Sequence, residues 1–117
     1  MRHLRVLALL PFLILFTGCR SPYIEATVSN RTTQPLGLIE VAYPSASFGT
    51  QGLAPGADLH YRFKVLGSGD MKLTYTDSAH HEQKSQGPFL KEGAEGKITI
   101  TISPEGTSWQ PAFTSKP

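Results

Sequence analysis

Glycine and proline interrupt this chain at short intervals, and this punctuation limits the folds that the chain can form. The sequence has 11 glycines and 9 prolines among 117 residues. The segments between them are short and rich in Val, Ile, Thr, Tyr and Phe, which are residue types favoured in strands. After the N-terminal apolar run, no stretch keeps a helical apolar period for ten residues without a Gly or Pro. The pattern predicts an all-β protein, a small antiparallel β-sandwich of about six or seven strands.

Five segments alternate or concentrate apolar residues in the manner of strands. They are Tyr23–Ser29, Leu36–Tyr43, Asp58–Leu66, Met71–Thr76 and Lys97–Ser103. Alternation predicts that a common set of side chains faces the core. This set is Ile24, Ala26, Val28, Leu59, Tyr61, Phe63, Val65, Met71, Leu73, Tyr75, Ile98, Ile100 and Ile102. In Leu36–Tyr43 the facing stays ambiguous, because apolar residues occupy both alternating positions.

The remaining segments are predicted to be connections. Residues 44–56 form a long connection from which Phe48 and Leu53 reach the core, and residues 67–70 form a hairpin loop. The polar stretch 77–86 is either a loop or an exposed edge strand. The domain is expected to span residues 23–103, followed by an irregular tail at 104–117.

The N-terminus has the composition of a secretory signal. Arg2 and Arg5 precede an apolar run over residues 6–16 that contains no polar side chain. An eleven-residue helix would span about 16 Å, roughly half of a bilayer core. A charged start, a short apolar core and small residues at its end predict a cleaved signal peptide over residues 1–18.

The stretch Phe16-Thr17-Gly18-Cys19 resembles the lipobox of bacterial lipoproteins. The resemblance covers residues 1–19 and implies lipidation of Cys19, the single cysteine of the chain, with residues 19–22 as the lipidated cysteine and a short spacer. Lipoproteins of this family carry palmitate-type acyl chains and lie in the cell envelope. Because Arg20 rather than Asp follows the cysteine, the resemblance implies the outer membrane if the host is Gram-negative. Ordinary secretion without lipid is the alternative.

Two further stretches resemble the strand openings of extracytoplasmic immunoglobulin-like or fibronectin-like sandwiches. They are TVSNRTTQPL at 27–36 and GLAPGADLHYRF at 52–63, where a turn glycine precedes an aromatic strand. The resemblance implies an immunoglobulin-like sandwich rather than a barrel.

The charge balance of the predicted mature chain argues against nucleic acid as a partner. Two of the 11 lysines and arginines precede the cleavage site, which leaves nine against 9 acidic residues. A neutral balance does not favour polyanions. With Cys19 lipidated, no thiol remains for a disulfide or a cysteine metal site.

Two groups of residues are candidate sites, and no catalytic residue is predicted. His80 and His81, with His60, could hold a metal ion if a loop brought the imidazoles together. Trp109 and Phe113 could form a partner-binding segment, or Trp109 could fold back over one end of the sandwich. Serines are plentiful, but none lies in an elbow motif and no cofactor-binding loop is present.

These observations predict a membrane-anchored lipoprotein that acts as a non-enzymatic binding or structural module of the envelope. Its expected partners are the membrane, through the lipid anchor, and another envelope protein. The alternative is a small-ligand or metal-binding lipoprotein that uses His60, His80 and His81.

Overall fold

The computed structural model describes residues 22–114, and the predicted signal peptide and Cys19 lie outside these residues. The described chain is all-β and contains no helix, and therefore no helix that is long and apolar enough to cross a membrane. The strands are β1 (Ile24–Asn30), β2 (Leu36–Tyr43), β3 (Ala46–Leu53), β4 (Asp58–Phe63), β5 (Gly69–Thr76), β6 (Glu82–Leu90), β7 (Glu95–Ser103) and β8 (Gly106–Thr114).

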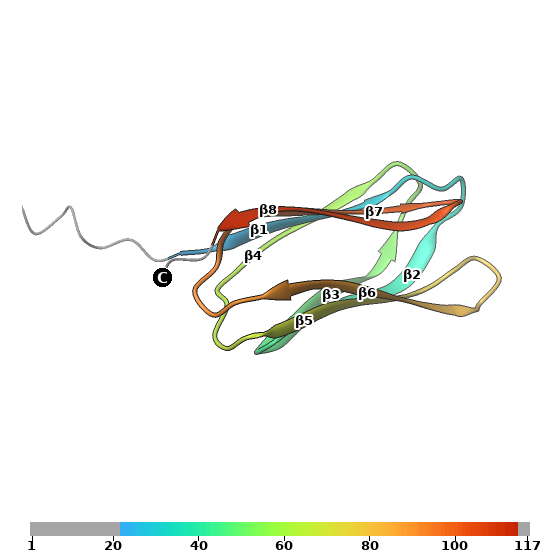
Figure 1. Cartoon of the computed structure of the whole chain (residues 1–117). Coiled ribbons are helices and arrows are strands. Elements are labelled where there is room, and N and C mark those ends of the chain that lie inside the picture. The colour runs from blue at the N-terminus through green and yellow to red at the C-terminus, as the bar shows by residue number, and fades with distance from the viewer. Residues whose placement is uncertain (1–21, 115–117) are drawn as a thin grey trace, which may run out of the picture.

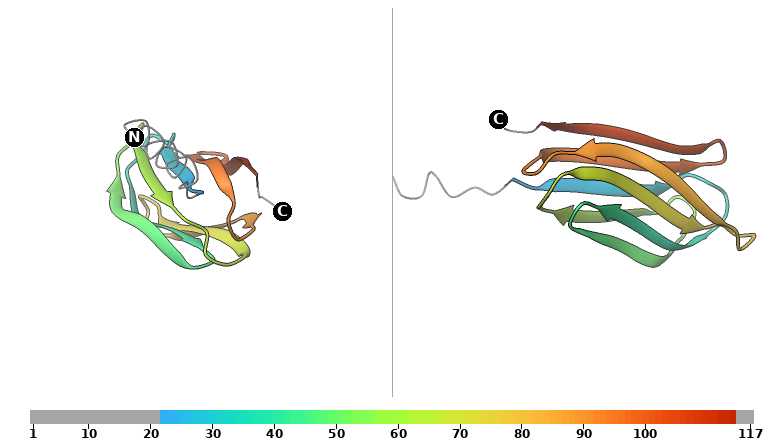
Figure 2. Two further views of the ribbon diagram at one scale, coloured as in Figure 1. Left: turned by 90° about the vertical axis from the view of Figure 1, so that its left-hand side faces the viewer. Right: turned by 60° about the horizontal axis from the view of Figure 1, so that its bottom comes forward.

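The eight strands form two sheets that pack face to face as a sandwich (Figures 1 and 2). The first sheet has the order β4-β1-β7-β8 and the second has the order β3-β2-β5-β6. All neighbouring strands are antiparallel except β1 and β7, which are parallel. The sandwich predicted from the sequence is confirmed, with eight strands rather than six or seven.

The core lies between the sheets, and most of the predicted inward side chains fill it. Alternation places Ile24, Ala26 and Val28 of β1 in the interior, and Met71 and Leu73 of β5 are also buried. The three isoleucines of β7 are fully enclosed: Ile98, Ile100 and Ile102. A period of two along each strand therefore supplies the apolar faces that hold the two sheets together.

A β-bulge settles the ambiguous facing of β2. The β2–β5 register shifts between Gly37 and Glu40, so that β2 has one extra residue there. Leu38 lies in this irregular stretch with a φ of 48°, and its side chain is 62% exposed. The extra residue allows Leu36 and Ile39, which are three positions apart, to be buried on the same face.

Two segments predicted as connections are strands. Residues 46–53 form β3, which pairs with β2, so the prediction of a long 44–56 connection was wrong, although Phe48 and Leu53 are buried as predicted. The predicted irregular tail is also wrong over Gly106–Thr114, which form β8 along β7. An edge strand needs a partner on one side only, so a serine- and proline-containing segment can occupy it.

The structure also decides the conformation of residues 77–86 and 67–70, which the sequence left open or predicted as a hairpin loop. Residues 82–90 form the edge strand β6, one of the two alternatives for this region. The predicted hairpin at 67–70 is wrong, because β4 and β5 belong to different sheets. The chain crosses from one sheet to the other at this point.

Candidate functional site

The edge of the second sheet formed by β3 is the candidate binding site. Four strands of the sandwich lie at sheet edges, namely β3, β4, β6 and β8. Natural proteins protect such edges with charged side chains or proline, because an unpaired edge can take up another strand. Three of the edges carry this protection: Asp58 and Arg62 on β4, Glu82, Lys84 and Pro88 on β6, and Pro111 on β8.

β3 has neither a charged residue nor a proline in its sequence ASFGTQGL. The strand is held to β2 over its whole length, from Leu36 opposite Leu53 to Tyr43 opposite Ala46. Gly49 allows the two backbones to approach closely, since a Cβ atom there would collide with the Ile39 carbonyl oxygen. β3 is therefore an ordered edge without the usual protection against pairing.

The outer surface of β2 and β3 is hollowed beside this edge. The exposed Leu38 side chain borders the shallow depression, together with Glu40, Ser47 and Thr50. The Ser47 hydroxyl donates a hydrogen bond to Glu40 Oε2 over 3.1 Å. An extended segment on the edge would thus meet an apolar contact and a polar pair on this face.

An aromatic cluster closes the sandwich between β3 and β4. Phe48 of β3 stacks on Tyr61 of β4, with 4.5 Å between ring centroids, and Tyr43 stacks on Phe63 with 3.9 Å. Burial, and secondarily the neighbouring Tyr61, raise the pKa of Tyr43. The Tyr61 ring stacks on the buried Phe48, but the prediction that Tyr61 fills the core was wrong, because this residue of an edge strand is 43% exposed. Its ring is available to a segment bound along β3.

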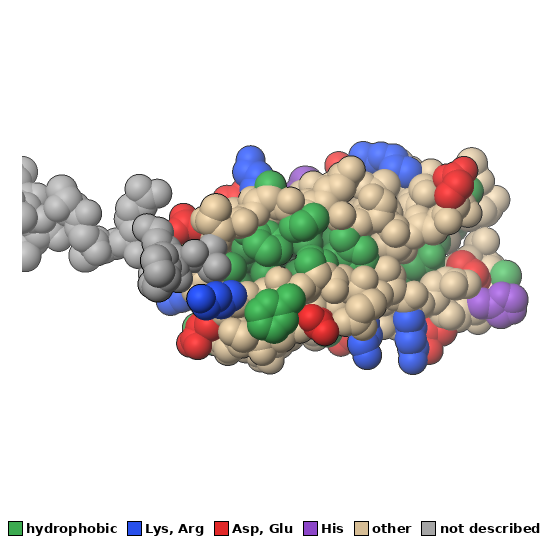
Figure 3. Space-filling model, viewed as in Figure 1, with side chains coloured by type: hydrophobic (Ala, Val, Ile, Leu, Met, Phe, Trp, Pro, Cys, Tyr) green, Lys and Arg blue, Asp and Glu red, His purple; other side chains and the backbone are tan. Residues whose placement is uncertain are grey.

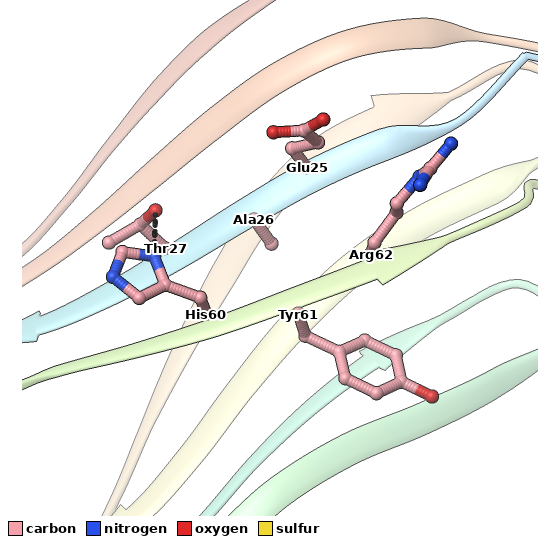
Figure 4. Close-up of a pocket in the computed structure, with 6 residues that line it drawn as sticks. All are labelled: Glu25, Ala26, Thr27, His60, Tyr61 and Arg62. Atoms are coloured by element: carbon pink, nitrogen blue, oxygen red, sulfur yellow. Dashed lines mark hydrogen bonds between the residues drawn. The ribbon is translucent and has the colours of Figure 1, made fainter.

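His60 lies on the outer face of the first sheet, away from the other candidate histidines. Its Nδ1 is 3.1 Å from Thr27 Oγ1 in a shallow depression between β1 and β4. In the close-up, His60, Thr27 and Arg62 project from one face of the sheet and Tyr61 projects from the other (Figure 4). Arg62 also stacks over the Tyr23 ring at 4.0 Å.

His80 and His81 lie in the turn between β5 and β6, which belong to the second sheet. The space-filling view shows histidine side chains at the end of the molecule far from the N-terminal trace (Figure 3). Asp77 organises this turn by accepting hydrogen bonds from the Ala79 and His81 amides, both over 2.9 Å. The structure does not bring His60 to these two residues, and within residues 22–114 no group of three or more His, Cys, Asp or Glu side chains could hold a metal ion.

Trp109 and Phe113, the other predicted site residues, belong to β8 and pack partly buried against the core. The Trp109 indole lies against Gly87 of β6, and its Nε1 donates a hydrogen bond to Ser85 Oγ over 2.8 Å. The ring thus folds back onto the sandwich, along the β6–β8 side rather than over an end. Cys19, the predicted lipidation site, lies outside the described residues.

Sequence reasoning missed β3 as a site because it treated 46–53 as part of a loop. One signal was present: Pro44 and Pro55-Gly56 bound a ten-residue segment that itself contains no proline. Turn residues on both sides of a short segment are typical of a strand.

Comparison with known proteins supports the fold. No family model and no curated protein matches the chain. Among solved structures, the chain is similar to the NMR structure of a protein from Eubacterium rectale, with a TM-score of 0.56 and 13% sequence identity. The similarity covers 80% of this chain and 93% of the other. At this identity the likeness shows a shared fold and no more.

Proposed function

We propose that the protein is a non-enzymatic binding module of the bacterial cell envelope. In this proposal a lipid on Cys19 anchors it, and it takes up an extended segment of another envelope protein along β3. The observation that carries the binding proposal is the β3 edge, an ordered strand with no charged residue and no proline.

The physics of strand addition fits this edge. Main-chain hydrogen bonds to the free side of an edge strand supply affinity, and pockets for alternate side chains supply specificity. The eight residues of β3 offer about 26 Å of backbone to a partner. Side chains of the added strand on the outer surface would extend across β3 toward the depression that Leu38 borders, and those on the inner side would extend toward Tyr61.

The proposed anchor is supported by the sequence before the described domain. A short apolar run ends in Phe16-Thr17-Gly18-Cys19, which resembles a lipobox. Two or three acyl chains hold a protein on a bilayer firmly, whereas one chain holds only marginally. Arg20 after the cysteine favours the outer membrane in a Gram-negative host.

The test is photo-crosslinking in the native host with a full-length tagged chain that carries a photoreactive residue at Gln51, an exposed position of β3. We expect one envelope protein to be crosslinked from this position. The test variant is Ser47→Lys/Gln51→Lys, and because it replaces Gln51, the photoreactive residue is moved to Ala46. In this variant the crosslink from position 46 to the partner should be abolished, because lysines on an edge strand oppose pairing. A Cys19→Ala chain tests the anchor separately, by membrane fractionation.

The matched control places the same charges on another edge. Ser108 and Gln110 are exposed residues of β8, so Ser108→Lys/Gln110→Lys should leave the crosslink at Ala46 intact. A partner that is captured equally by the β3 and β8 lysine variants does not bind by strand addition at β3, and the proposal would then be wrong. Thermal unfolding of both variants verifies that the fold is preserved.

A further inference from the structure

The end of the sandwich at which the N-terminal segment joins β1 carries exposed apolar side chains. We call this end the N-terminal pole and define it by the connections 64–68 and 91–94, which lie beside the start of β1. Leu66 in the first connection is 63% exposed. Phe89, one residue before the end of β6, is 59% exposed.

The two connections are tied to each other, so Leu66 and Phe89 are displayed on an ordered platform. The Gly93 amide donates a hydrogen bond to the Val65 carbonyl over 3.1 Å. The Glu92 amide donates a second bond to Ser68 Oγ over 2.9 Å. Phe89 lies opposite Asp70 at the start of β5, a few residues along the chain from Leu66.

The chain outside the described domain identifies what faces this pole. Cys19, the proposed anchor, precedes β1 by a few residues, so in the proposed mature chain the tether joins the domain at this end. Four peptide steps separate Cys19 from Tyr23, which is a maximum of about 14 Å of extended chain. A domain tethered at Cys19 therefore keeps its N-terminal pole close to the lipid headgroups.

We infer that the N-terminal pole contacts the bilayer surface, with Leu66 and Phe89 inserted at the level of the headgroups. This inference rests on the proposed anchor. Apolar side chains buried at this depth strengthen an interfacial contact in proportion to the area they remove from water. The contact holds the sandwich in a preferred orientation, with the turn between β5 and β6 directed away from the membrane.

The charges of the pole indicate that the contact is apolar rather than electrostatic. Within the two connections, the exposed Lys64 and Lys91 are accompanied by the exposed Glu92, and the exposed Asp70 follows the first connection at the start of β5, so the signs balance once this neighbour is included. A balanced set gains little from anionic lipids, whose attraction for basic segments is screened by salt. We expect the contact to persist at high salt.

Photo-crosslinking to lipid tests the inference with the full chain reconstituted into vesicles of phosphatidylethanolamine and phosphatidylglycerol. A photoreactive amino acid replaces Leu66, Phe89 or Leu38 in turn. Leu38 is the matched control, because it is 62% exposed and lies near the start of β2. This end of β2 is the one far from the N-terminal pole. Lipid adducts, detected by mass spectrometry, are expected at positions 66 and 89 and absent at 38.

The other outcomes overturn the inference and can be told apart. A chain that floats with the vesicles but gives no adduct at 66 or 89 has an anchor and no contact at the pole. Equal adduct formation at 38, 66 and 89 means that the domain has no preferred orientation. A chain that does not float with the vesicles refutes the proposed anchor, and the inference with it.

Discussion

The Trp109 Nε1 donates a hydrogen bond to Ser85 Oγ over 2.8 Å, and this bond joins edge strands that belong to different sheets. β8 and β6 have no backbone pairing with each other, so the indole spans the gap between them. The opposite side of the sandwich is closed by the stacked rings of Phe48 and Tyr61. The β6–β8 side of the sandwich is thus closed by a hydrogen bond from the indole, and the β3–β4 side is closed by aromatic stacking.

Removing either partner of the Trp109–Ser85 bond should destabilise the fold by a similar amount. A part-buried neutral hydrogen bond contributes about 0.5–1.5 kcal/mol. We expect Ser85→Ala to cost about 1 kcal/mol and Trp109→Phe slightly more, since the smaller ring also loses packing. Urea unfolding followed by circular dichroism measures both variants and the double variant. Strictly additive losses in the double variant would show that the two side chains are not coupled.

Gly87→Ala should displace the Trp109 indole. A Cβ atom at position 87 would lie 2.6 Å from two carbons of the indole ring, which is too close for contact. Overpacking of this kind typically costs about 1–3 kcal/mol. We expect lower stability and a red shift of the Trp109 fluorescence, because the displaced ring becomes more exposed to water.

Gly52→Ala is the control for this substitution. Gly52 is, like Gly87, a glycine within a strand, but it is exposed, and a Cβ atom there would meet only the Leu36 carbonyl oxygen at 3.8 Å, an ordinary contact. Its substitution should leave the fluorescence unchanged. An emission spectrum of Gly87→Ala identical to that of the parent chain would contradict the placement of the indole.

The strands that could be predicted from the sequence are those whose own side chains reveal the burial pattern. β7 alternates Ile98, Ile100 and Ile102 with polar residues, and burial follows directly. β3 could not be found in this way, because glycine within it weakens the sequence signal of a strand. Gly49 is present because the two backbones approach closely there, and this approach is a property of the folded sheet. β3 is an edge strand because β2 pairs with β5 on its other side. The sequence alone does not specify this pairing of strands.

The site residues follow the same division. The lipidation of Cys19 is predicted from the local sequence before it and stays a prediction, because Cys19 lies outside the described residues. Trp109 was placed in a tail because Pro111 and several Ser and Thr residues suggested irregular chain. The register of β8 against β7 makes it an edge strand, and this register is a property of the assembled sheet.

Asn30→Ala should be among the most destabilising single substitutions in the domain. Asn30 is fully buried, and its Nδ2 donates to the Leu53 and Gln34 carbonyls, both over 2.9 Å. Its Oδ1 accepts from the Thr32 amide over 2.9 Å. Loss of the side chain removes these three hydrogen bonds from a buried position, at a cost of about 2–4 kcal/mol in the free energy of unfolding.

Thr33→Ala is the control for Asn30→Ala, since Thr33 is exposed in the connection that follows Asn30 and its substitution should change stability by less than about 0.5 kcal/mol. Urea unfolding monitored by Trp109 fluorescence compares the two variants. Similar stabilities for Asn30→Ala and Thr33→Ala would contradict the structural role given to the buried amide.

The stability of the domain should fall in acid partly because of Asp58. A hydrogen bond from Ser29 is the main cause that lowers the pKa of Asp58, and the Arg31 guanidinium, 3.2 Å away, lowers it further. A carboxyl whose pKa is lower in the folded state stabilises the fold above its unfolded pKa, and this contribution is lost as pH falls through the folded pKa. The loss therefore occurs below about pH 4, the ordinary range of an aspartate.

Asp58→Asn should be less stable than the parent at neutral pH, and the difference should shrink as the pH is lowered through this window. Urea unfolding between neutral pH and strong acid measures it, and a difference that does not depend on pH would show that ionisation of Asp58 does not stabilise the fold.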